Sequence, residues 1–523
     1  MATLIAEQID ATPDAVAVVD SATSRTWAGL GARVDALVAG LRARGLAEGD
    51  AVAVMAGNQC ETVEIALACL HGGWLLVPVN WHWVAPELAY VVRDAGAAAI
   101  VVGSGWAPVA AEALAGFGAG DGPSLRLVTG PGDPPPGFEA YEAVLEAGRG
   151  LEPGVECRGG VMFYTSGTTG SPKGVRGALA ELGGPVEIWS LIAASIADTL
   201  QVPGTDGVQL LCGPIYHSAQ FVTSIAPLIA GARLVMQHRF DAAEVLDLVD
   251  RHRVTNAHLV PAQMVRLLRL DVSARSSFDG SSLRAVFHGA APCPESVKRS
   301  MIEWWGPIVW EYYGGTEGGF ITVISPDEWL VRPGSVGRPT PVVEILVVDG
   351  DGRRLGAGEP GDLYFRNLLG SDFRYHNAED KTEAAHLEPG VGTLGDIGYL
   401  DDEGYLFLSD RRIDMIISGG VNIYPAEIES TLVAHPAVAD CAVFGVPDDE
   451  MGERVMAAVQ PVDPAADAEV LFADLEAHCR RELAGYKCPR AWELRDSLPR
   501  NDAGKLAKRM LRDPYWEGRP AAI

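Results

Sequence analysis

Hydrophobic and polar positions along the first half of the chain alternate between two periods. Short runs of apolar residues predict buried strands at 15–19, 51–55, 75–79, 99–102 and 160–164. Between the first two runs, Leu30, Val34, Leu37, Val38 and Leu41 follow helical spacing. A similar alternation continues from about 185 to 300. Strands that alternate with helices predict an α/β fold.

The pattern changes twice in the second half. Residues 334–365 are rich in valine, glycine and alternating positions, which predicts a smaller β subdomain. Beyond about 410, the pattern predicts a helix at 425–434, strands at 438–446 and 455–461, and an amphipathic helix at 467–484. A chain of 523 residues also exceeds one ordinary core. We therefore expect a large N-terminal domain of αβ-layered subdomains and a β subdomain, 1–410, and a small mobile α+β domain, 411–523.

Composition and charge exclude some classes of binding partner. A formal net charge of −28 argues against binding to nucleic acid or to an anionic membrane surface. No run approaches the ~20 apolar residues of a membrane span, and we expect no signal peptide. Eight cysteines without a C-x-x-C spacing are typical of buried thiols in a reducing compartment. The expected location is the cytoplasm.

One segment carries more chemical information than any other. Residues 164–175 read YTSGTTGSPKGV and combine hydroxyl groups, glycines and a single lysine. Glycines let backbone N–H groups approach an anion, hydroxyls donate further hydrogen bonds, and a lysine suits phosphate. Pro172 stands where the Walker pattern requires glycine. Composition alone therefore fits either a phosphate loop or a flexible surface loop.

The order of residues in this segment resembles the phosphate loop of the adenylate-forming (AMP-binding) superfamily. That superfamily includes acyl-CoA synthetases, aryl-CoA ligases, peptide-synthetase adenylation domains and luciferases. Further segments resemble its motifs, in the same order, at 213–219 (GPIYHSA), 288–292 (HGAAP), 311–317 (EYYGGTE), 393–399 (TLGDIGY), 410–429, 485–489 (GYKCP) and 499–505 (PRNDAGK). The resemblance covers nearly the whole chain and is greatest to bacterial acyl-CoA synthetases and fatty-acid–CoA ligases.

The resemblance implies a two-step reaction that uses ATP, Mg²⁺ and CoA. A carboxylate would attack the α-phosphorus of ATP to give an acyl-adenylate and pyrophosphate, and the CoA thiol would then displace AMP. When the family's roles are carried over motif by motif, the residues that would bind the β- and γ-phosphates are Thr165, Ser166, Gly167, Thr168, Thr169, Gly170 and Lys173. Thr316 would bind the α-phosphate, and Glu317 would bind the metal. Gly289, Ala290, Ala291 and Tyr313 would frame the adenine, Gly314 belongs to the same nucleotide site, and Asp396 and Arg411 would bind the ribose.

The catalytic lysine implied by the resemblance is Lys505, which lies in the smaller domain. This domain would therefore have to close over the larger one to complete the site. Its CoA-facing residues would be Ser418, Gly419, Gly420 and Lys487. His217 would gate the acyl tunnel, although a hydrogen-bonded place in a polar wall is the alternative. Ile413 stands where the family usually carries a charged hinge residue.

For the substrate, the residues favour an apolar tunnel and an aliphatic or aromatic acid. The apolar side chains expected to line the tunnel are Phe221, Leu259, Val260, Met264, Phe287 and Phe320. The segment 79–83 also resembles fatty-acyl members of the family. A second hypothesis keeps adenylation but transfers to a carrier protein, an amine or oxygen, or activates an unusual acid such as nitrite. A third is a nucleotide-binding regulator without turnover. The acid, the acceptor and a homodimeric state stay open.

Overall fold

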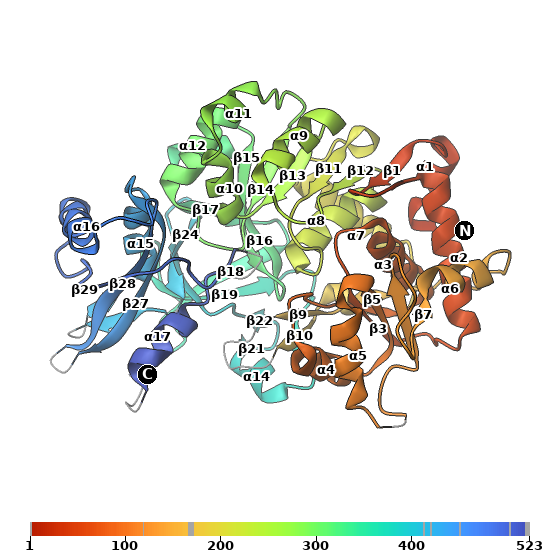
Figure 1. Ribbon diagram of the computed structural model, residues 1–523. Helices are drawn as coiled ribbons and strands as arrows, with labels where there is room; N and C mark the ends of the chain where they lie inside the picture. Colours follow the sequence, from red (N-terminus) through yellow and green to blue (C-terminus); the bar gives the residue numbers. More distant parts are fainter. Residues whose placement is uncertain are drawn as a thin grey trace.

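The computed structural model describes residues 3–118, 120–165, 172–411, 414–418, 421–448, 451–500 and 504–517, with the backbone alone at 410 and 411. Figure 1 shows a large N-terminal part and a smaller C-terminal part at one end of the molecule. This arrangement confirms the predicted α/β class and the large-plus-small architecture. Within the described residues, no helix is both long and apolar enough to cross a lipid bilayer.

The first sheet is entirely parallel across its described strands. Its order is β7 (Glu139–Ala140), β6 (Leu125–Thr129), β5 (Ala97–Gly103), β3 (Ala51–Met55), β4 (Leu75–Pro78) and β8 (Gly160–Val161). In the central strand, Ala53 faces Val77 on one side and Ile100 on the other. All five residues of β3 are buried, as expected of a strand covered on both faces.

The second sheet is parallel in its first half and antiparallel in its second. Apart from the short β2 (Ser24–Thr26), the parallel half contains β1 (Val16–Val19), β12 (Arg233–Met236), β11 (Val208–Leu211), β13 (Asn256–Leu259), β14 (Ala285–His288) and β15 (Val309–Gly315). The antiparallel half contains β16 (Gly319–Ile324), β17 (Ser335–Pro339), β24 (Leu406–Arg411), β23 (Asp396–Leu400), β19 (Gly361–Asn367), β18 (Val343–Val348), β22 (Val391–Gly392) and β21 (His386–Glu388).

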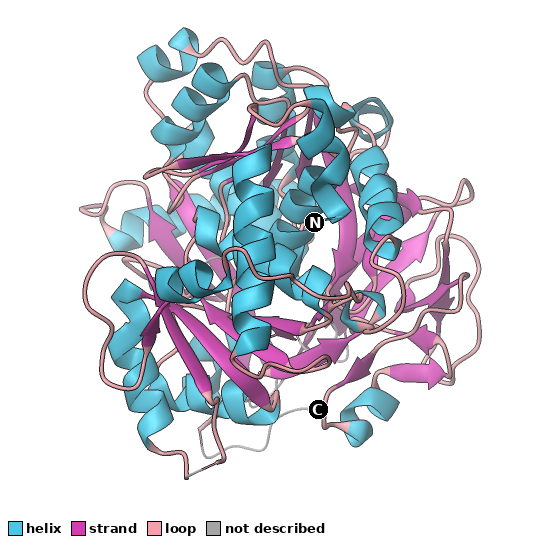
Figure 2. Ribbon diagram, turned by 90° about the vertical axis from the view of Figure 1, so that its right-hand side faces the viewer, coloured by secondary structure: helices cyan, strands magenta, loops and turns pink. Residues whose placement is uncertain are grey.

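The main hydrophobic core lies between these two sheets. Buried side chains of α2 (Trp27–Ala43), α3 (Cys60–Gly72) and α8 (Ser218–Ile229) pack together with residues from strands of both sheets, such as Val54 and Leu211. Figure 2 shows helices packed between and around the strands. Burial of this apolar surface holds the two sheets in a fixed relation. That relation positions the loops at the strand ends.

Other helices lie around the sheets. The N-terminal ones are α1 (Ala6–Ala11), α4 (Ala85–Asp94), α5 (Ala107–Ala115), α6 (Tyr141–Gly148) and α7 (Ile188–Thr199), of which α6 and α7 also contribute buried side chains to the core between the sheets. The central ones are α9 (Ala242–His252), α10 (Pro261–Leu268), α11 (Val272–Ser277), α12 (Glu295–Trp305), α13 (Pro326–Val331) and α14 (Glu379–Ala384). Short 3₁₀ turns lie at Thr3–Ile5, Ser104–Trp106, Ala178–Ala180 and Gly204–Asp206.

The run at 160–164, expected to form one strand, belongs to two sheets. Its first half is β8, whereas β9 (Phe163–Thr165) pairs with β10 (Lys173–Arg176), which in turn pairs with β20 (Arg374–Tyr375). The register places Thr165 opposite Lys173, so the segment between them joins the two strands of a hairpin. Residues 166–171 of the predicted phosphate loop lie outside the described residues.

The C-terminal part has a sheet and a core of its own. Its strands are β25 (Ile416–Ser418), β26 (Val421–Ile423), β27 (Val438–Asp448), β28 (Gly452–Pro461) and β29 (Ala491–Leu494). The helices α15 (Pro425–Val433) and α16 (Ala468–Glu482) contribute Ile428, Leu432 and Leu475 to the buried cluster. The helix α17 (Lys508–Trp516) follows as the last element. The chain changes sheets between the end of β24 and the start of β25.

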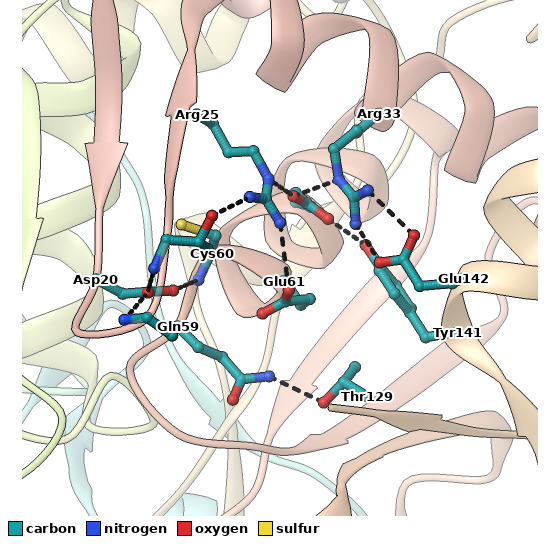
Figure 3. A network of polar contacts seen from close by, with 12 residues as sticks. Asp20, Arg25, Arg33, Gln59, Cys60, Glu61, Thr129, Tyr141 and Glu142 are labelled. Carbon is teal, nitrogen blue, oxygen red and sulfur yellow. Dashed lines mark hydrogen bonds and ion pairs between the residues drawn. The ribbon is translucent and has the colours of Figure 1, made fainter. Parts of the chain in front are cut away.

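A buried ionic cluster ties together several elements of the N-terminal part. Figure 3 shows Arg25 of β2, Arg33 of α2 and Tyr141 of α6 converging on a carboxylate of α3. That carboxylate belongs to Glu64, which is fully buried and accepts hydrogen bonds from Arg25 Nε at 2.8 Å, Arg33 Nε at 2.7 Å and the Tyr141 hydroxyl at 2.8 Å. A buried carboxylate with this many donors is fully compensated and fixes how the elements pack.

Candidate active site

A cavity of about 2910 Å³ lies between the two parts of the chain. Its wall includes residues of β9, β10, β13 and β15 from the N-terminal part, and of α15, α17 and the segment before α17 from the C-terminal part. The predicted site residues that line it are Thr165, Lys173, His217, Ala290, Ala291, Tyr313, Gly314, Thr316, Glu317, Asp396 and Lys505. The structure thus brings together in one space residues from motifs spread over the whole sequence.

Some predicted site residues lie elsewhere. Gly289, Ser418 and Lys487 are described but do not line the cavity. Ser166, Gly167, Thr168, Thr169, Gly170, Ile413, Gly419 and Gly420 lie outside the described residues, as does the side chain of Arg411. The backbone of Arg411 is described, and it pairs with Asp396 across β23 and β24.

On one side of the cavity, a lysine and a carboxylate meet at a tyrosine. Lys173 Nζ lies 4.7 Å from the centre of the Tyr375 ring, and the Tyr375 hydroxyl donates to Glu317 Oε1 at 3.1 Å. Burial, with the positive charge of Lys381, lowers the pKa of Lys173, while Glu317 opposes that shift. A cation held partly out of water gains strongly from an incoming anion.

The segment before α8 places two further polar groups at the cavity. His217 precedes the first residue of α8, and its ring packs against Tyr216 with the ring centres 4.4 Å apart. The next residue, Ser218, has its hydroxyl oxygen 2.8 Å from that of Thr316. Because Thr316 follows β15, this hydrogen bond joins the start of α8 to the predicted α-phosphate residue.

A third group of residues lies where the adenosine is expected. The Tyr313 hydroxyl donates to Asp396 Oδ2 at 2.7 Å, which couples the end of β15 to β23. Ala290, just after β14, has a φ of +67°, a value that side-chain-bearing residues rarely adopt. Such a backbone costs of order 1 kcal/mol or more and marks a turn that the surrounding packing enforces.

The C-terminal part inserts one loop into the cavity. Gly504 has a φ of +73°, and a side chain there would meet Val260 and Ala262 of the N-terminal part at 3.1 Å. The glycine therefore permits both the left-handed turn and the close approach. Arg500 supports the loop, since its Nη1 donates to the Gly504 carbonyl at 2.7 Å. Lys505, the next residue, lines the cavity.

Two of the expected CoA-facing residues, Ser418 and Lys487, are described and lie outside the cavity wall. Ser418 ends β25, where it pairs with Val421 and Gly452. Lys487 donates to both carboxylate oxygens of Glu427, at 2.7 and 2.6 Å. Neither residue lines the cavity that holds Lys505.

The cavity is more polar than the apolar tunnel that the sequence predicts. Val260 and Phe320 line the cavity, whereas the prediction is wrong for four other apolar residues, because Phe221, Leu259, Met264 and Phe287 pack into hydrophobic cores. Side chains alternate along a strand, so His258 faces the cavity while its neighbour Leu259 points to the opposite face. Gln220 and Tyr312 also line the cavity.

Several of these residues escaped the sequence analysis. Ser218 and Gln220 belong to or follow the motif at 213–219, but nothing in the motif distinguishes them from other residues of a helix start. Tyr375 and Arg500 act through partners distant in sequence, Glu317 and Asp440. Distance along the chain hides such pairs from periodicity and motif spacing.

The side chains that could bind the Mg²⁺ implied by the motifs are few among the described residues. Among the described residues, no group of three or more histidine, cysteine, aspartate and glutamate side chains is arranged to hold a metal ion. Glu317 nonetheless places one carboxylate in the cavity near Lys173. A single carboxylate suits Mg²⁺ that is bound mainly by substrate phosphates and water.

Comparisons with known proteins agree with this site. Residues 5–369 match the family model of the AMP-binding enzymes, and residues 427–505 match that of the AMP-binding enzyme C-terminal domain. This chain belongs to the AMP-binding enzyme family. The two matched segments include most of the N-terminal wall of the cavity and Lys505, whereas Tyr375 and Asp396 lie between them. The adenylate-forming superfamily predicted from the motifs is confirmed.

Relatives and solved structures cover nearly the whole chain. Long-chain-fatty-acid–CoA ligase FadD13 of Mycobacterium tuberculosis is 31% identical over 98% of both chains. Fatty acid–[acyl-carrier-protein] ligase ScoC of Streptomyces coeruleorubidus is 32% identical over 96% of this chain and 94% of its own. The structure of o-succinylbenzoate CoA synthetase (MenE) from Bacillus subtilis with its acyl-adenylate intermediate has a TM-score of 0.80, with 28% identity and 98% coverage of each chain.

Family membership and these similarities establish the reaction class. This AMP-binding enzyme is an AMP-forming acid–thiol ligase, which activates a carboxylic acid with ATP and transfers the acyl group to CoA. A carboxylic acid, ATP and CoA are accordingly its small-molecule substrates.

Proposed function

We propose that the cavity between the two domains is the adenylation site and that Lys505 completes it from the C-terminal domain. One observation carries the proposal: the Gly504–Lys505 loop packs on Val260 and Ala262, so Lys505 lines the same cavity as Lys173 and Thr316. An ammonium group between the acid carboxylate and the α-phosphate would offset the repulsion of two anions as they meet. The domain boundary that goes with this proposal lies between 410 and 411.

The first step joins the acid to AMP. A carboxylate oxygen attacks the α-phosphorus, the bond from that phosphorus to the bridging oxygen breaks, and pyrophosphate leaves. Thr316, with Ser218 bonded to its hydroxyl, is our candidate to orient the α-phosphate. Lys173 and Thr165 are our candidates for the β- and γ-phosphates, together with 166–170 of the connecting loop. Positioning and charge are the main contributions a protein makes to such a step.

The remaining groups bind the nucleotide and its metal. We assign adenine to Ala290, Ala291 and the Tyr313 ring, flanked by Gly289 and Gly314. We assign the ribose hydroxyls to Asp396, which the Tyr313 hydroxyl already orients, and to Arg411 on the paired strand. Glu317 would hold Mg²⁺ against the phosphates, and Tyr375 fixes one oxygen of that carboxylate.

The second step requires the C-terminal domain to present another face. We propose that it rotates about the segment near Ile413, which brings Ser418, Lys487 and the glycines at 419 and 420 toward the CoA thiol. The thiol sulfur attacks the acyl carbon, and the bond from that carbon to the AMP oxygen breaks. For Lys487 to meet a CoA phosphate, it would exchange its present ion pair with Glu427 for that phosphate.

For the acid itself, we propose an aliphatic or aromatic carboxylate whose tail lies beyond His217, between Val260 and Phe320. His217 is our candidate gate, because it lies beside Ser218 at the entrance to α8. We also propose that the enzyme forms a homodimer and that it is located in the cytoplasm. The eight free cysteines support the second, since free thiols persist in reducing compartments.

A second candidate function differs only in the acceptor. The similarity to ScoC, named as a fatty acid–[acyl-carrier-protein] ligase, favours transfer to a carrier protein as the alternative. Transfer to an amine or to oxygen is another alternative of this kind, as is the activation of an unusual acid such as nitrite. In each of them the adenylation half of the site is unchanged.

The test is pyrophosphate release with a panel of acids, each assayed with and without CoA. The panel contains short to long fatty acids, benzoate, cinnamate and nitrite. Turnover that depends on CoA and on one class of acid supports the proposal and identifies the substrate. Release that ignores CoA favours another acceptor, and ATP binding without any acid-dependent release contradicts the adenylation site.

A further inference from the structure

The acid pocket contains a buried polar chain that the assigned roles leave unused. Gln220 of α8, His258 of β13 and Tyr312 of β15 all line the cavity, and they are only 4%, 1% and 6% exposed. Gln220 Nε2 lies 2.9 Å from His258 Nδ1, and His258 Nε2 lies 3.0 Å from the Tyr312 hydroxyl oxygen. Three elements of the N-terminal domain thus contribute to one hydrogen-bonded chain.

The chain ends in an atom that no described protein group satisfies. Gln220 Oε1 is buried, and it has no hydrogen-bond partner among the described residues. Leaving a buried polar atom unpaired costs about 1–3 kcal/mol. A ligand can pair with this atom, because Gln220 lines the cavity.

The chain is electrically neutral. Burial lowers the pKa of His258 to about 4, so at neutral pH one ring nitrogen donates a hydrogen bond and the other accepts one. If Gln220 Nε2 donates to His258, the amide oxygen is left for a ligand. If the amide is turned over, its N–H groups are left instead. A hydroxyl can pair with either end, because it both donates and accepts.

Packing fixes the chain in place. A side chain at Gly213 would collide with the Gln220 amide, so glycine there makes room for it. The Tyr312 ring meets Phe320 edge to face, with ring centres 4.7 Å apart. A charged ligand group would gain no opposite charge from these three residues and would lose its hydration, which favours a neutral group.

We propose that Gln220, supported by His258 and Tyr312, recognises a hydroxyl group on the tail of the acid. The substrate class is then a hydroxylated carboxylic acid, and Gln220 is a residue that determines specificity. This inference rests on the proposed function, since it places the acid tail in the same cavity. A site built to pair with a hydroxyl disfavours the analogue that lacks it, because the buried polar atoms are then left unpaired.

The test compares acids that differ by one hydroxyl. Pyrophosphate release is measured, with CoA present, for benzoate against its 2-, 3- and 4-hydroxy forms, cinnamate against 4-hydroxycinnamate, and octanoate against 3- and 8-hydroxyoctanoate. In at least one pair, kcat/KM for the hydroxy acid should exceed that of its partner by about tenfold or more. Gln220→Leu and Gln220→Met should both bring that ratio close to one, chiefly by slowing the hydroxy acid.

Gln237 provides the matched control. It is another buried glutamine whose Oε1 has no partner among the described residues, but it does not line the cavity. Gln237→Leu should therefore keep the wild-type ratio. Two variants are made at Gln220, so that the inference can still be tested with one of them if the other misfolds.

Two kinds of failure are distinguishable. Preference for the unsubstituted acid in every pair, or a ratio that persists in the Gln220 variants, overturns the inference and leaves adenylation intact. Absence of pyrophosphate release with every acid contradicts the proposed function instead, and the inference falls with it.

Discussion

Positive charge reaches the cavity from two domains of a strongly acidic chain. The formal net charge is −28, and the sequence contains six lysines, of which Lys173, Lys505 and Lys508 line the cavity. ATP is a polyanion that such a protein repels at a distance. Each lysine in the cavity should therefore contribute strongly to phosphate binding, and its removal should slow one particular step of the reaction.

Lys505→Ala should abolish acyl-adenylate formation, with a loss of about 100-fold or more in its rate. It should leave thioester formation from a supplied acyl-adenylate largely intact, because the proposed rotation moves Lys505 away and presents another face of the domain in that step. The two half-reactions are measured separately, by pyrophosphate release and by acyl-CoA formation. Equal loss in both would contradict the role of the lysine.

Glu317→Gln should raise the Mg²⁺ concentration needed for half-maximal adenylation by about tenfold, the equivalent of roughly 1.4 kcal/mol. Glutamine keeps an oxygen that can accept from Tyr375 but removes the negative charge that attracts the metal. A titration of the adenylation rate with MgCl₂ gives the value. An unchanged titration would sink the ligand assignment.

Motif order brought together eleven of the residues that line the cavity, including Lys173, Thr316, Asp396 and Lys505. It could not predict which neighbouring side chains line the same wall. Leu259 and His258 are neighbours in sequence, but only the sheet decides which of them faces the cavity. A strand that is buried on both faces has no alternation of apolar and polar residues, so its sequence does not predict which side chains face the cavity.

At the scale of elements, one ion pair shapes the loop that carries Lys505, the proposed catalytic lysine. Arg500 donates to both oxygens of Asp440, at 2.6 and 2.7 Å, and also to the Gly504 carbonyl. Asp440 belongs to β27, a long strand of the C-terminal sheet. The pair therefore anchors a short loop to a rigid element, and bidentate geometry limits its movement.

Arg500→Ala and Asp440→Asn should each slow adenylation by about 10- to 100-fold, because a misplacement of the lysine by 1 Å is enough for such a loss. Thioester formation from a supplied acyl-adenylate should change little. Arg480→Ala is the matched control, since its pair with Glu476 is also arginine to carboxylate in the same domain but lies in solvent. Slowing of both half-reactions alike would indicate general damage to the domain.

The elements themselves were predictable to different degrees. The strand at 51–55 coincides with β3, and the helix predicted at 467–484 overlaps α16. The run at 160–164 was predicted as one strand but divides between two sheets. Periodicity predicts that a run is extended and buried, whereas which strand it pairs with depends on contacts far away in sequence.

At the scale of the whole molecule, buried neutral histidines link stability to pH. His71 of α3 is 2% exposed, and its Nε2 accepts a hydrogen bond from the backbone of Leu4 at 3.1 Å. Burial is the main cause that lowers the pKa of His71 to about 3. In the unfolded chain the same group titrates near 6.5. Between these values the unfolded state binds the extra proton, so stability is full above pH 6.5 and falls as the pH falls.

His71→Gln should make the protein less sensitive to acid. Glutamine offers an oxygen to the Leu4 backbone but does not titrate, so the variant avoids a loss of about 2 kcal/mol between pH 7 and pH 5. The measurement is the melting temperature at both values. Wild type and variant both fall, since His258 also titrates, but wild type should fall further. An identical fall in the two proteins would contradict the assignment.

The contact between Gly504 and the pair Val260 and Ala262 has one more consequence. Val260 also lines the acid pocket, so the wall that fits the substrate is the same surface that seats the lysine loop. We expect an acid too wide for the cavity to push this wall outward and displace the loop. Such an acid should bind yet react slowly, so that the substrate is selected by the rate of adenylation more than by affinity. A poorly fitting acid would then be rejected before ATP is consumed.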